Sequence, residues 1–261
     1  ETTVQSLMCA RTQGTSVEIS GEDVPLLEAP CVMSLYDRIA REQMARELSW
    51  VDIQQSDAQS VGEALLRIAA RADLTTQLTR RVVGAALKAV LAWPAGLKCS
   101  INITAADLAV ARFPQEVLDM ASDLAVDPSR ITLEITEQAL LGDLDLAARS
   151  LGLLRDAGMK IALDDFGAGF CNFGYLKYLP LDIIKLDRIM LDGVAENARD
   201  RAVLRGVMAM ARALDLDVLA EGVENERQRQ IALEEGCTAY QGFLRAKPLT
   251  QGDFLELVRE G

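Results

Sequence analysis

Polar residues that could do chemistry stand at the ends of successive apolar runs between residues 98 and 244. In chain order they are Asn102, Glu134, Asp164 with Asp165, Lys185 with Asp187, Glu221 with Glu224, and Gln241. A carboxylate buried in such a run costs free energy unless a cation or a hydrogen-bond donor compensates it. Any one of them could be a satisfied core residue. Six successive runs that each deliver a polar group indicate one shared polar patch.

The donor atoms of this patch are mostly oxygens. The chain has no histidine, and its five cysteines are scattered without a Cys-x-x-Cys pair. Imidazole catalysis, His-containing metal sites and zinc knuckles are therefore excluded. Carboxylate and amide oxygens favour Mg²⁺, Mn²⁺ or Ca²⁺, and two such ions can activate water for attack on phosphorus. The residues alone thus predict a metal-assisted hydrolase, with a phosphodiester as the expected substrate.

The elements that must position these residues alternate between strands and helices. Apolar runs predict strands at 98–103, 131–135, 160–163, 183–186, 218–220 and 239–244. Apolar residues at helical spacing predict helices at 78–91, 115–125, 144–157, 199–214, 226–235 and 252–259. This alternation is typical of a parallel sheet covered by helices. When such a sheet closes into a (β/α)8 barrel, the catalytic residues lie at the carboxyl ends of the strands.

Two further strands are predicted at 32–36 and 44–51. The short connection between them indicates an antiparallel pair, because a parallel crossover needs about a dozen residues or more. Two strands plus six predict an α/β fold, a modified TIM (β/α)8 barrel with an antiparallel first strand. A doubly wound open sheet is the alternative, although no Gly-x-Gly-x-x-Gly segment opens a helix to favour a dinucleotide fold.

The domain boundaries and the compartment follow from composition. Residues 1–30 are predicted to be a linker or the end of an upstream region, with one strand near 17–19, and residues 31–261 to be the barrel. The 27 Lys and Arg against 39 Asp and Glu give a net charge of −12, which argues against a nucleic-acid duplex or an anionic membrane as partner. No apolar run reaches the ~18 residues of a membrane helix. Because the chain begins at Glu1, we expect a cytoplasmic domain of a larger protein, with any membrane anchor outside this fragment.

Several segments resemble the EAL domain family, which comprises cyclic di-GMP-specific phosphodiesterases and their inactive relatives. They are SINIT (100–104), LEITE (133–137), ALDDFGAGF (162–170), IKLDR (184–188), AEGVEN (220–225) and YQGFL (240–244). The resemblance covers roughly residues 31–259 and implies a modified TIM barrel in a bacterial signalling protein. It also implies cyclic di-GMP as substrate and a two-metal site for Mg²⁺ or Mn²⁺. An upstream sensor or GGDEF-like domain and a homodimer through the barrel are compatible with it.

The glutamate of the family signature has two candidates. The literal string EALLR starts at Glu63, but it carries apolar residues at helical spacing and precedes Asn102 by only 39 residues. Glu47 precedes Asn102 by 55 residues and lies on the second strand of the predicted hairpin. The spacing that the family layout implies favours Glu47 as the signature acid.

The resemblance then implies a role for each matching residue. The metal ligands would be Glu47, Asn102, Glu134, Asp164, Asp165 and Glu221. The catalytic groups would be Lys185, which orients water or phosphate, together with Glu221, Glu47 and Asp165. Support for the substrate or for the loop 166–172 would come from Glu137, Glu224, Gln241, Gly167 and Gly169, whose glycines allow tight turns.

Two departures from the family pattern fall in the first strands. Val51 stands where the family usually has an arginine that contacts the dinucleotide, and Met33-Ser34 replaces a Gln-Pro. Both weaken the case for substrate binding more than the case for metal binding. Three functions therefore stay open: an active phosphodiesterase, whose turnover could be weak because of Val51; a receptor that binds cyclic di-GMP without hydrolysis; and a degenerate barrel kept for protein contacts.

Overall fold

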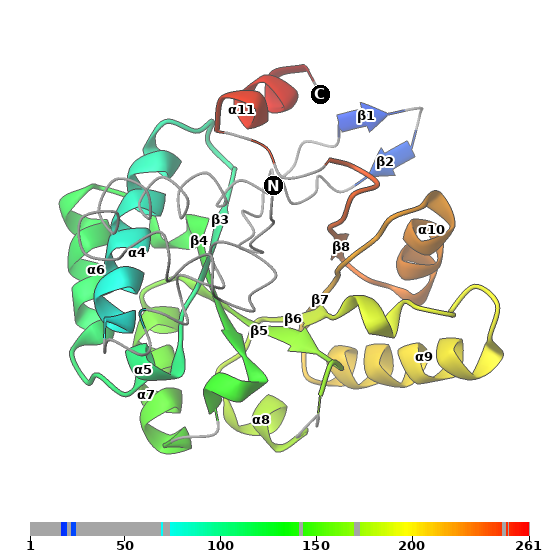
Figure 1. The fold of residues 1–261 in the computed structure, drawn as a ribbon, viewed down its shortest axis with the longest axis horizontal. Helices are drawn as coiled ribbons and strands as arrows, with labels where there is room; N and C mark the ends of the chain where they lie inside the picture. The colour runs from blue at the N-terminus through cyan, green and yellow to red at the C-terminus, as the bar shows by residue number, and fades with distance from the viewer. Residues whose placement is uncertain are drawn as a thin grey trace, which may run out of the picture.

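The computed structural model describes residues 17–19, 22–24, 69, 74–140, 143–169, 173–246, 249 and 251–260. Its main feature is a parallel sheet of six strands in the order β3-β4-β5-β6-β7-β8 (Figure 1). The strands are β3 (Cys99–Asn102), β4 (Ile131–Thr136), β5 (Lys160–Phe166), β6 (Ile183–Leu186), β7 (Asp217–Ala220) and β8 (Ala239–Tyr240). Sequence order equals spatial order, so each strand pairs with the next one along the chain, as in a TIM-type barrel.

Most predicted elements are confirmed within a few residues. The longer helices are α4 (Thr75–Leu91), α6 (Phe113–Asp123), α7 (Leu144–Asp156), α9 (Ala198–Ala213), α10 (Glu226–Glu235) and α11 (Gln251–Glu260). Among the described residues, the structure adds two short α-helices that the sequence did not predict, α5 (Ala105–Leu108) and α8 (Phe173–Tyr178). Helices this short carry no repeating apolar stripe, which is the signal that sequence analysis detects.

The strand predicted at 239–244 is too long, because β8 ends at Tyr240. The chain turns away at Gly242, where an added Cβ would lie 2.1 Å from the carbonyl oxygen of Val223. This close approach between two backbones is open only to glycine. Strand β5, by contrast, is longer than predicted and continues to Phe166, with an irregular register between Leu163 and Phe166.

The N-terminal region is only partly described. The strand expected near 17–19 is β1 (Val17–Ile19), which pairs antiparallel with β2 (Glu22–Val24). The hairpin predicted at 32–36 and 44–51 lies outside the described residues, as do Glu47, Val51 and Glu63. The antiparallel first strand of the barrel therefore stays a prediction, and every pairing within the six-stranded sheet is parallel.

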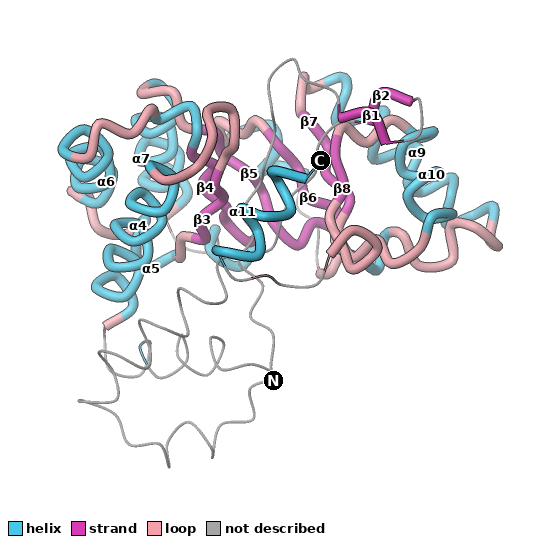
Figure 2. The backbone as a smooth tube through the Cα atoms, turned by 90° about the horizontal axis from the view of Figure 1, so that it is seen from above, coloured by secondary structure: helices cyan, strands magenta, loops and turns pink. Residues whose placement is uncertain are grey.

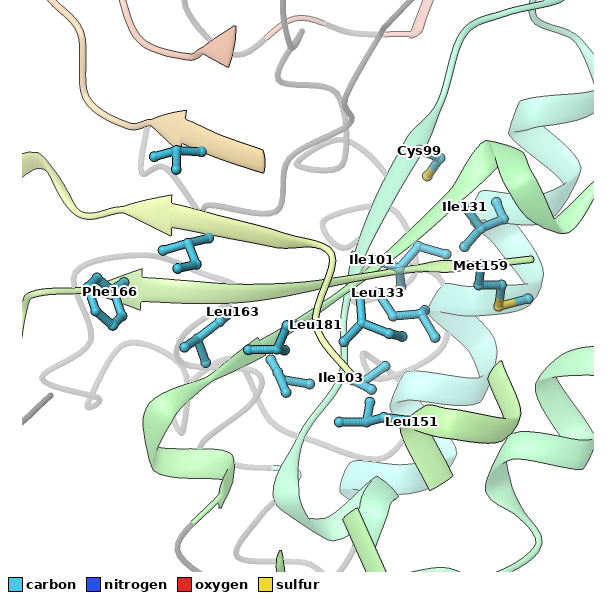
Figure 3. Close-up of a cluster of buried hydrophobic side chains, with 14 of the residues drawn as sticks. Cys99, Ile101, Ile103, Ile131, Leu133, Leu151, Met159, Leu163, Phe166 and Leu181 are labelled. Atoms are coloured by element: carbon cyan, nitrogen blue, oxygen red, sulfur yellow. The ribbon is translucent and has the colours of Figure 1, made fainter. Parts of the chain in front are cut away.

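The core lies between the sheet and its helices. Figure 1 shows α4, α6 and α7 beside β3 and β4, and α9 and α10 beside β7 and β8, and Figure 2 shows the same two groups of helices on opposite sides of the sheet. Buried side chains of the sheet form a cluster that includes Ile101, Leu133 and Leu163, and Leu151 of α7 belongs to the same cluster (Figure 3). Continuous apolar runs are thus explained by strands buried on both faces.

One buried acid holds the amino ends of two strands in place. Asp182, directly before β6, accepts hydrogen bonds from the backbone N–H of Ile161 (3.0 Å), from Lys160 (3.0 Å) and from Arg155 (3.2 Å). Its side chain is 7% exposed. The contacts join β5, β6 and α7 at the edge of the sheet opposite the strand ends that carry Asp164 and Lys185.

Asp182→Ala should lower the free energy of unfolding by about 2 kcal/mol, because it removes charge-assisted hydrogen bonds and leaves a buried donor behind. Urea unfolding followed by circular dichroism measures this. Asp119→Ala is a matched control on exposed helix surface and should stay within ~0.5 kcal/mol of wild type. A result for Asp182→Ala inside that same range would contradict a structural role for Asp182.

Candidate active site

The register of the sheet brings the predicted site residues to one edge. Asn102 lies opposite Glu134 in the β3–β4 pair, and Asp164 lies opposite Thr136 in the β4–β5 pair. Lys185 precedes the last residue of β6, and Glu221 directly follows β7. Because all six strands run in the same direction, these residues gather at the carboxyl edge of the sheet.

Lys185 is the centre of the cluster. Its Nζ lies 2.8 Å from Asp164 Oδ1, 2.8 Å from Glu221 Oε1 and 3.0 Å from Glu134 Oε2. The lysine and Glu134 are each 1% exposed. Three buried carboxylates therefore meet at the ammonium group of one buried lysine. The four side chains come from β4, β5, β6 and the residue directly after β7.

Two further contacts orient the carboxylates. Gln241, directly after β8, donates from Nε2 to Glu221 Oε1 over 2.7 Å. The backbone N–H of Asp165 donates to Asp164 Oδ1 over 3.1 Å, and Asp165 itself has a positive φ of 55°. A positive φ is uncommon outside glycine and marks a backbone held in an unfavourable conformation by its surroundings.

The donor set fits a hard divalent cation. Asp164, Asp165 and Glu221 each offer one carboxylate oxygen, and these oxygens lie within 4.8 Å of one another. Glu134 Oε1 and Gln241 Oε1 are buried and have no hydrogen-bond partner. Oxygen atoms left unpaired in a buried acidic cluster are the ligands that Mg²⁺ and Mn²⁺ prefer.

Burial raises the pKa of three carboxyl groups at this site, those of Glu134, Glu221 and Asp165. Burial raises the pKa of Glu134 to about 7, although Lys185 opposes the shift. Burial likewise raises the pKa of Glu221 well above its usual value, and the negative charge of Asp164 adds to this effect. For Asp165, desolvation and then the charge of Asp164 raise the pKa to about 6. Perturbed carboxylates in one cluster are typical of functional sites.

The raised pKa of Glu134 predicts that the difference in the free energy of unfolding between wild type and Glu134→Gln depends on pH. Between its usual value of 4.5 and about 7, the folded protein holds a proton on Glu134 that the unfolded chain has released. Stability from this group is therefore complete below pH 4.5 and is lost as pH rises through about 7. Without divalent cations, Glu134→Gln should become more stable relative to wild type as pH rises from about 5 to about 8. Urea unfolding at both pH values tests this, and a constant difference would contradict the burial effect.

The remaining predicted residues lie around this cluster. Glu137 begins the 3-10 helix η3 (Glu137–Leu140) and is close enough to raise the pKa of Asp165. Glu224 forms an exposed ion pair with Arg188, 2.6 Å from Oε1 to Nη1. Gly167 has a φ of 102°, whereas a Cβ on Gly169 would meet nothing within 4 Å. The tight turn in the described part of this loop is thus at Gly167.

One neighbour of the site was not found from the sequence. A Cβ on Gly167 would lie 2.5 Å from Cγ of Met190, which ends the 3-10 helix η4 (Arg188–Met190). Met190 therefore packs directly against the turn that follows Asp164 and Asp165. A methionine two residues after the Asp187-Arg188 pair gives no chemical signal, because methionine most often fills gaps in a core.

No helix among the described residues is long and apolar enough to cross a membrane.

Comparison with known proteins gives consistent matches. The family model for the EAL domain matches residues 38–248. The bifunctional diguanylate cyclase/cyclic di-GMP phosphodiesterase MucR of Pseudomonas aeruginosa is 31% identical over 74% of this chain and 29% of its own length. An uncharacterized protein of Mycobacterium tuberculosis is 38% identical over 57% of this chain and 24% of its own length. The chain thus matches about a quarter of the length of these relatives.

Solved structures share the fold. PaMucR phosphodiesterase in complex with c-di-GMP has a TM-score of 0.67 and 31% identity, covering 73% of this chain and 78% of that one. The EAL domain of Mycobacterium smegmatis DcpA has a TM-score of 0.67 and 30% identity, covering 72% and 87%. With the acidic cluster at the carboxyl edge of a parallel sheet, and the family match extending over 38–248, this chain belongs to the EAL domain family.

Proposed function

We propose that this domain hydrolyses cyclic di-GMP to linear pGpG with Mg²⁺ or Mn²⁺. The observation that carries the proposal is the buried cluster of Glu134, Asp164 and Glu221 around Lys185. The cluster combines ligands that are all oxygen atoms with the ammonium group of one lysine. The chain also belongs to the EAL domain family, and a cyclic di-GMP phosphodiesterase is among its relatives. The ligands proposed for the metals are Glu47, Asn102, Glu134, Asp164, Asp165 and Glu221.

The chemistry divides between the ions and the chain. A bound pair of Mg²⁺ or Mn²⁺ would lower the pKa of water and stabilise the negative charge that develops on the phosphoryl oxygens. Hydrolysis adds water across one P–O bond of the ring and leaves one phosphomonoester and one hydroxyl group. Lys185 supplies an ammonium group beside the carboxylates, for water or for a phosphate oxygen. Gln241 fixes the orientation of Glu221 through its hydrogen bond to Oε1.

The rest of the barrel belongs to the same proposal. Residues 31–261 form the domain in this account, with residues 1–30 as the linker or the end of an upstream region. The strands at 32–36 and 44–51 supply the antiparallel first strand and Glu47. The longer relatives support an upstream sensor or a GGDEF-like domain, since one of them is named as both cyclase and phosphodiesterase. A cytoplasmic location and a homodimer through the barrel complete the proposal.

A second function is supported by Val51. Without the usual arginine, substrate binding loses a charge-assisted hydrogen bond of ~1.5–3 kcal/mol, which is about ten- to a hundredfold in affinity. A domain of this kind could bind cyclic di-GMP as a receptor without turning it over.

One experiment separates the two functions. Calorimetry with cyclic di-GMP in Ca²⁺ measures binding, and chromatography after addition of Mn²⁺ measures formation of pGpG. Binding followed by product supports the hydrolase, whereas binding without product supports the receptor. If neither binding nor product is observed, both functions are overturned. The remaining function is then a degenerate barrel kept for protein contacts.

A further inference from the structure

Asp107, in the short helix α5 after β3, is a buried acid that the proposed chemistry does not use. The residue is 0% exposed. Its Oδ2 accepts hydrogen bonds from the backbone N–H of Thr104 (2.8 Å), from the Thr104 hydroxyl (2.7 Å) and from the Thr79 hydroxyl (2.9 Å). Its Oδ1 is buried without a hydrogen-bond partner among the described residues. Burial of an oxygen left unpaired costs free energy, so stability alone does not account for an acid at this position.

The contacts of Asp107 fix the chain that follows Asn102, the last residue of β3. The next residue, Ile103, donates from its backbone N–H to the carbonyl oxygen of Glu134 over 2.9 Å. Thr104 is then held by Asp107 through both its backbone N–H and its hydroxyl. Asp107 is in turn held by a threonine hydroxyl of α4. The chain that leaves β3 is therefore attached to β4 on one side and to α4 on the other.

This segment lies next to the acidic cluster. Asn102 is paired with Glu134 in the β3–β4 register, and paired residues of neighbouring strands point to the same face of a sheet. The helix α5 also contacts η3, which begins at Glu137. A shift of the segment after β3 would thus move Asn102, which is one of the ligands in the proposed function.

We propose that Asp107 is a positioning residue of the metal site: it holds the chain after β3 so that the amide of Asn102 stays on the side of the carboxylates. It does so as an acceptor for three donors that would otherwise leave Thr104 and α4 unconnected. The apparent affinity for a cation falls in proportion to the fraction of molecules in which the ligand is in place. This inference rests on the metal site of the proposed function and adds a residue outside the set of ligands.

Asp107→Ala tests the positioning, because it removes the acceptor. Calorimetric titration with Mn²⁺ should show binding at least about tenfold weaker than in wild type, the low end of the ~10–100-fold cost of losing a residue that supports a metal ligand. Without metal, amide hydrogen exchange should be faster at Thr104 and its neighbours and unchanged in β6. Wild-type Mn²⁺ affinity in a folded Asp107→Ala variant would overturn the proposal.

Two variants separate positioning from a general loss of stability. Asp182→Ala also removes a buried acid that accepts three hydrogen bonds, but at the opposite edge of the sheet, so it should keep wild-type Mn²⁺ affinity. Asp107→Asn keeps an oxygen that can accept from the same donors and should bind Mn²⁺ nearly as tightly as wild type. The proposal is overturned if Asp182→Ala, or Asp107→Asn, loses as much affinity as Asp107→Ala.

Combination with Asn102→Ala identifies the residue through which Asp107 acts. Asn102→Ala alone should weaken Mn²⁺ binding, because it removes a proposed ligand. Addition of Asp107→Ala should then cause little further loss, since residues that act as a unit have effects that do not add. If the two losses multiply in the double variant, Asp107 acts elsewhere and the proposal is wrong.

The outcomes separate this inference from the proposed function. If wild type binds Mn²⁺ and Asp107→Ala binds it equally well, the inference falls alone. If wild type binds no Mn²⁺, the metal site falls and the inference with it. If Asp107→Ala does not fold, Thr79→Val takes its place, because it keeps the branched shape and removes the hydroxyl that ties Asp107 to α4. Thr79→Val should bind Mn²⁺ more weakly than wild type, and unchanged affinity would overturn the inference.

Discussion

Asp164→Ala should weaken Mn²⁺ binding by more than ~100-fold and leave the fold intact. Loss of a residue that only supports a metal ligand already costs ~10–100-fold, so loss of a direct ligand should cost more. Asp164 accepts from Lys185 and from the backbone of Asp165, and a small side chain at this strand end opens no large apolar cavity. Calorimetric titration with Mn²⁺ measures the affinity, and circular dichroism checks the fold.

The same titration with Glu134→Ala tests the metal site at a second ligand, so the result does not depend on Asp164 alone. Glu134 lies on the neighbouring strand, and its Oε1 has no hydrogen-bond partner. Its loss should also reduce Mn²⁺ affinity strongly. Asp182→Ala serves as the control, because this buried acid lies at the opposite edge of the sheet and should keep wild-type affinity. Unchanged affinity in both site variants would rule out the site.

The second large effect is expected from Glu47→Gln. This change should eliminate either the hydrolysis of cyclic di-GMP or the binding of Mn²⁺. The assignment rests on the spacing of 55 residues between Glu47 and Asn102. A glutamine keeps the shape of the side chain and removes the charge that a metal ligand needs. Product formation followed by chromatography measures the loss.

Glu63→Gln is the matched control, because it makes the same chemical change at the competing glutamate. It should behave as a helix surface substitution, with wild-type turnover and a stability within ~0.5 kcal/mol of wild type. The reverse pattern, an inactive Glu63→Gln beside an active Glu47→Gln, would overturn the alignment of the first two strands.

The sheet was predictable because its strands are buried on both faces. Runs such as 131–135 and 183–186 are continuous and apolar, and they alternate with helices that carry an apolar stripe. A parallel sheet also places its strand ends along one edge by geometry alone. The gathering of Glu134, Asp164 and Lys185 could therefore be predicted without any knowledge of side-chain contacts.

Other features depend on contacts between distant segments. The early end of β8 follows from the approach of Gly242 to Val223, and the pairing of Glu224 follows from the position of Arg188 after a different strand. The joint contact of Lys185 with three acids requires four neighbouring strands in register. No local pattern in the sequence encodes these distances, so the sequence predicted which residues meet but not which atoms.

The most direct measurement of the central claim is anomalous scattering from crystals grown with Mn²⁺ and cyclic di-GMP. The account predicts Mn²⁺ at the carboxyl edge of the sheet, at ~2.0–2.6 Å from oxygens of Glu134, Asp164 and Glu221, with the dinucleotide beside it. Absence of Mn²⁺ from this edge at saturating concentration, with Lys185 still in contact with all three carboxylates, would contradict it.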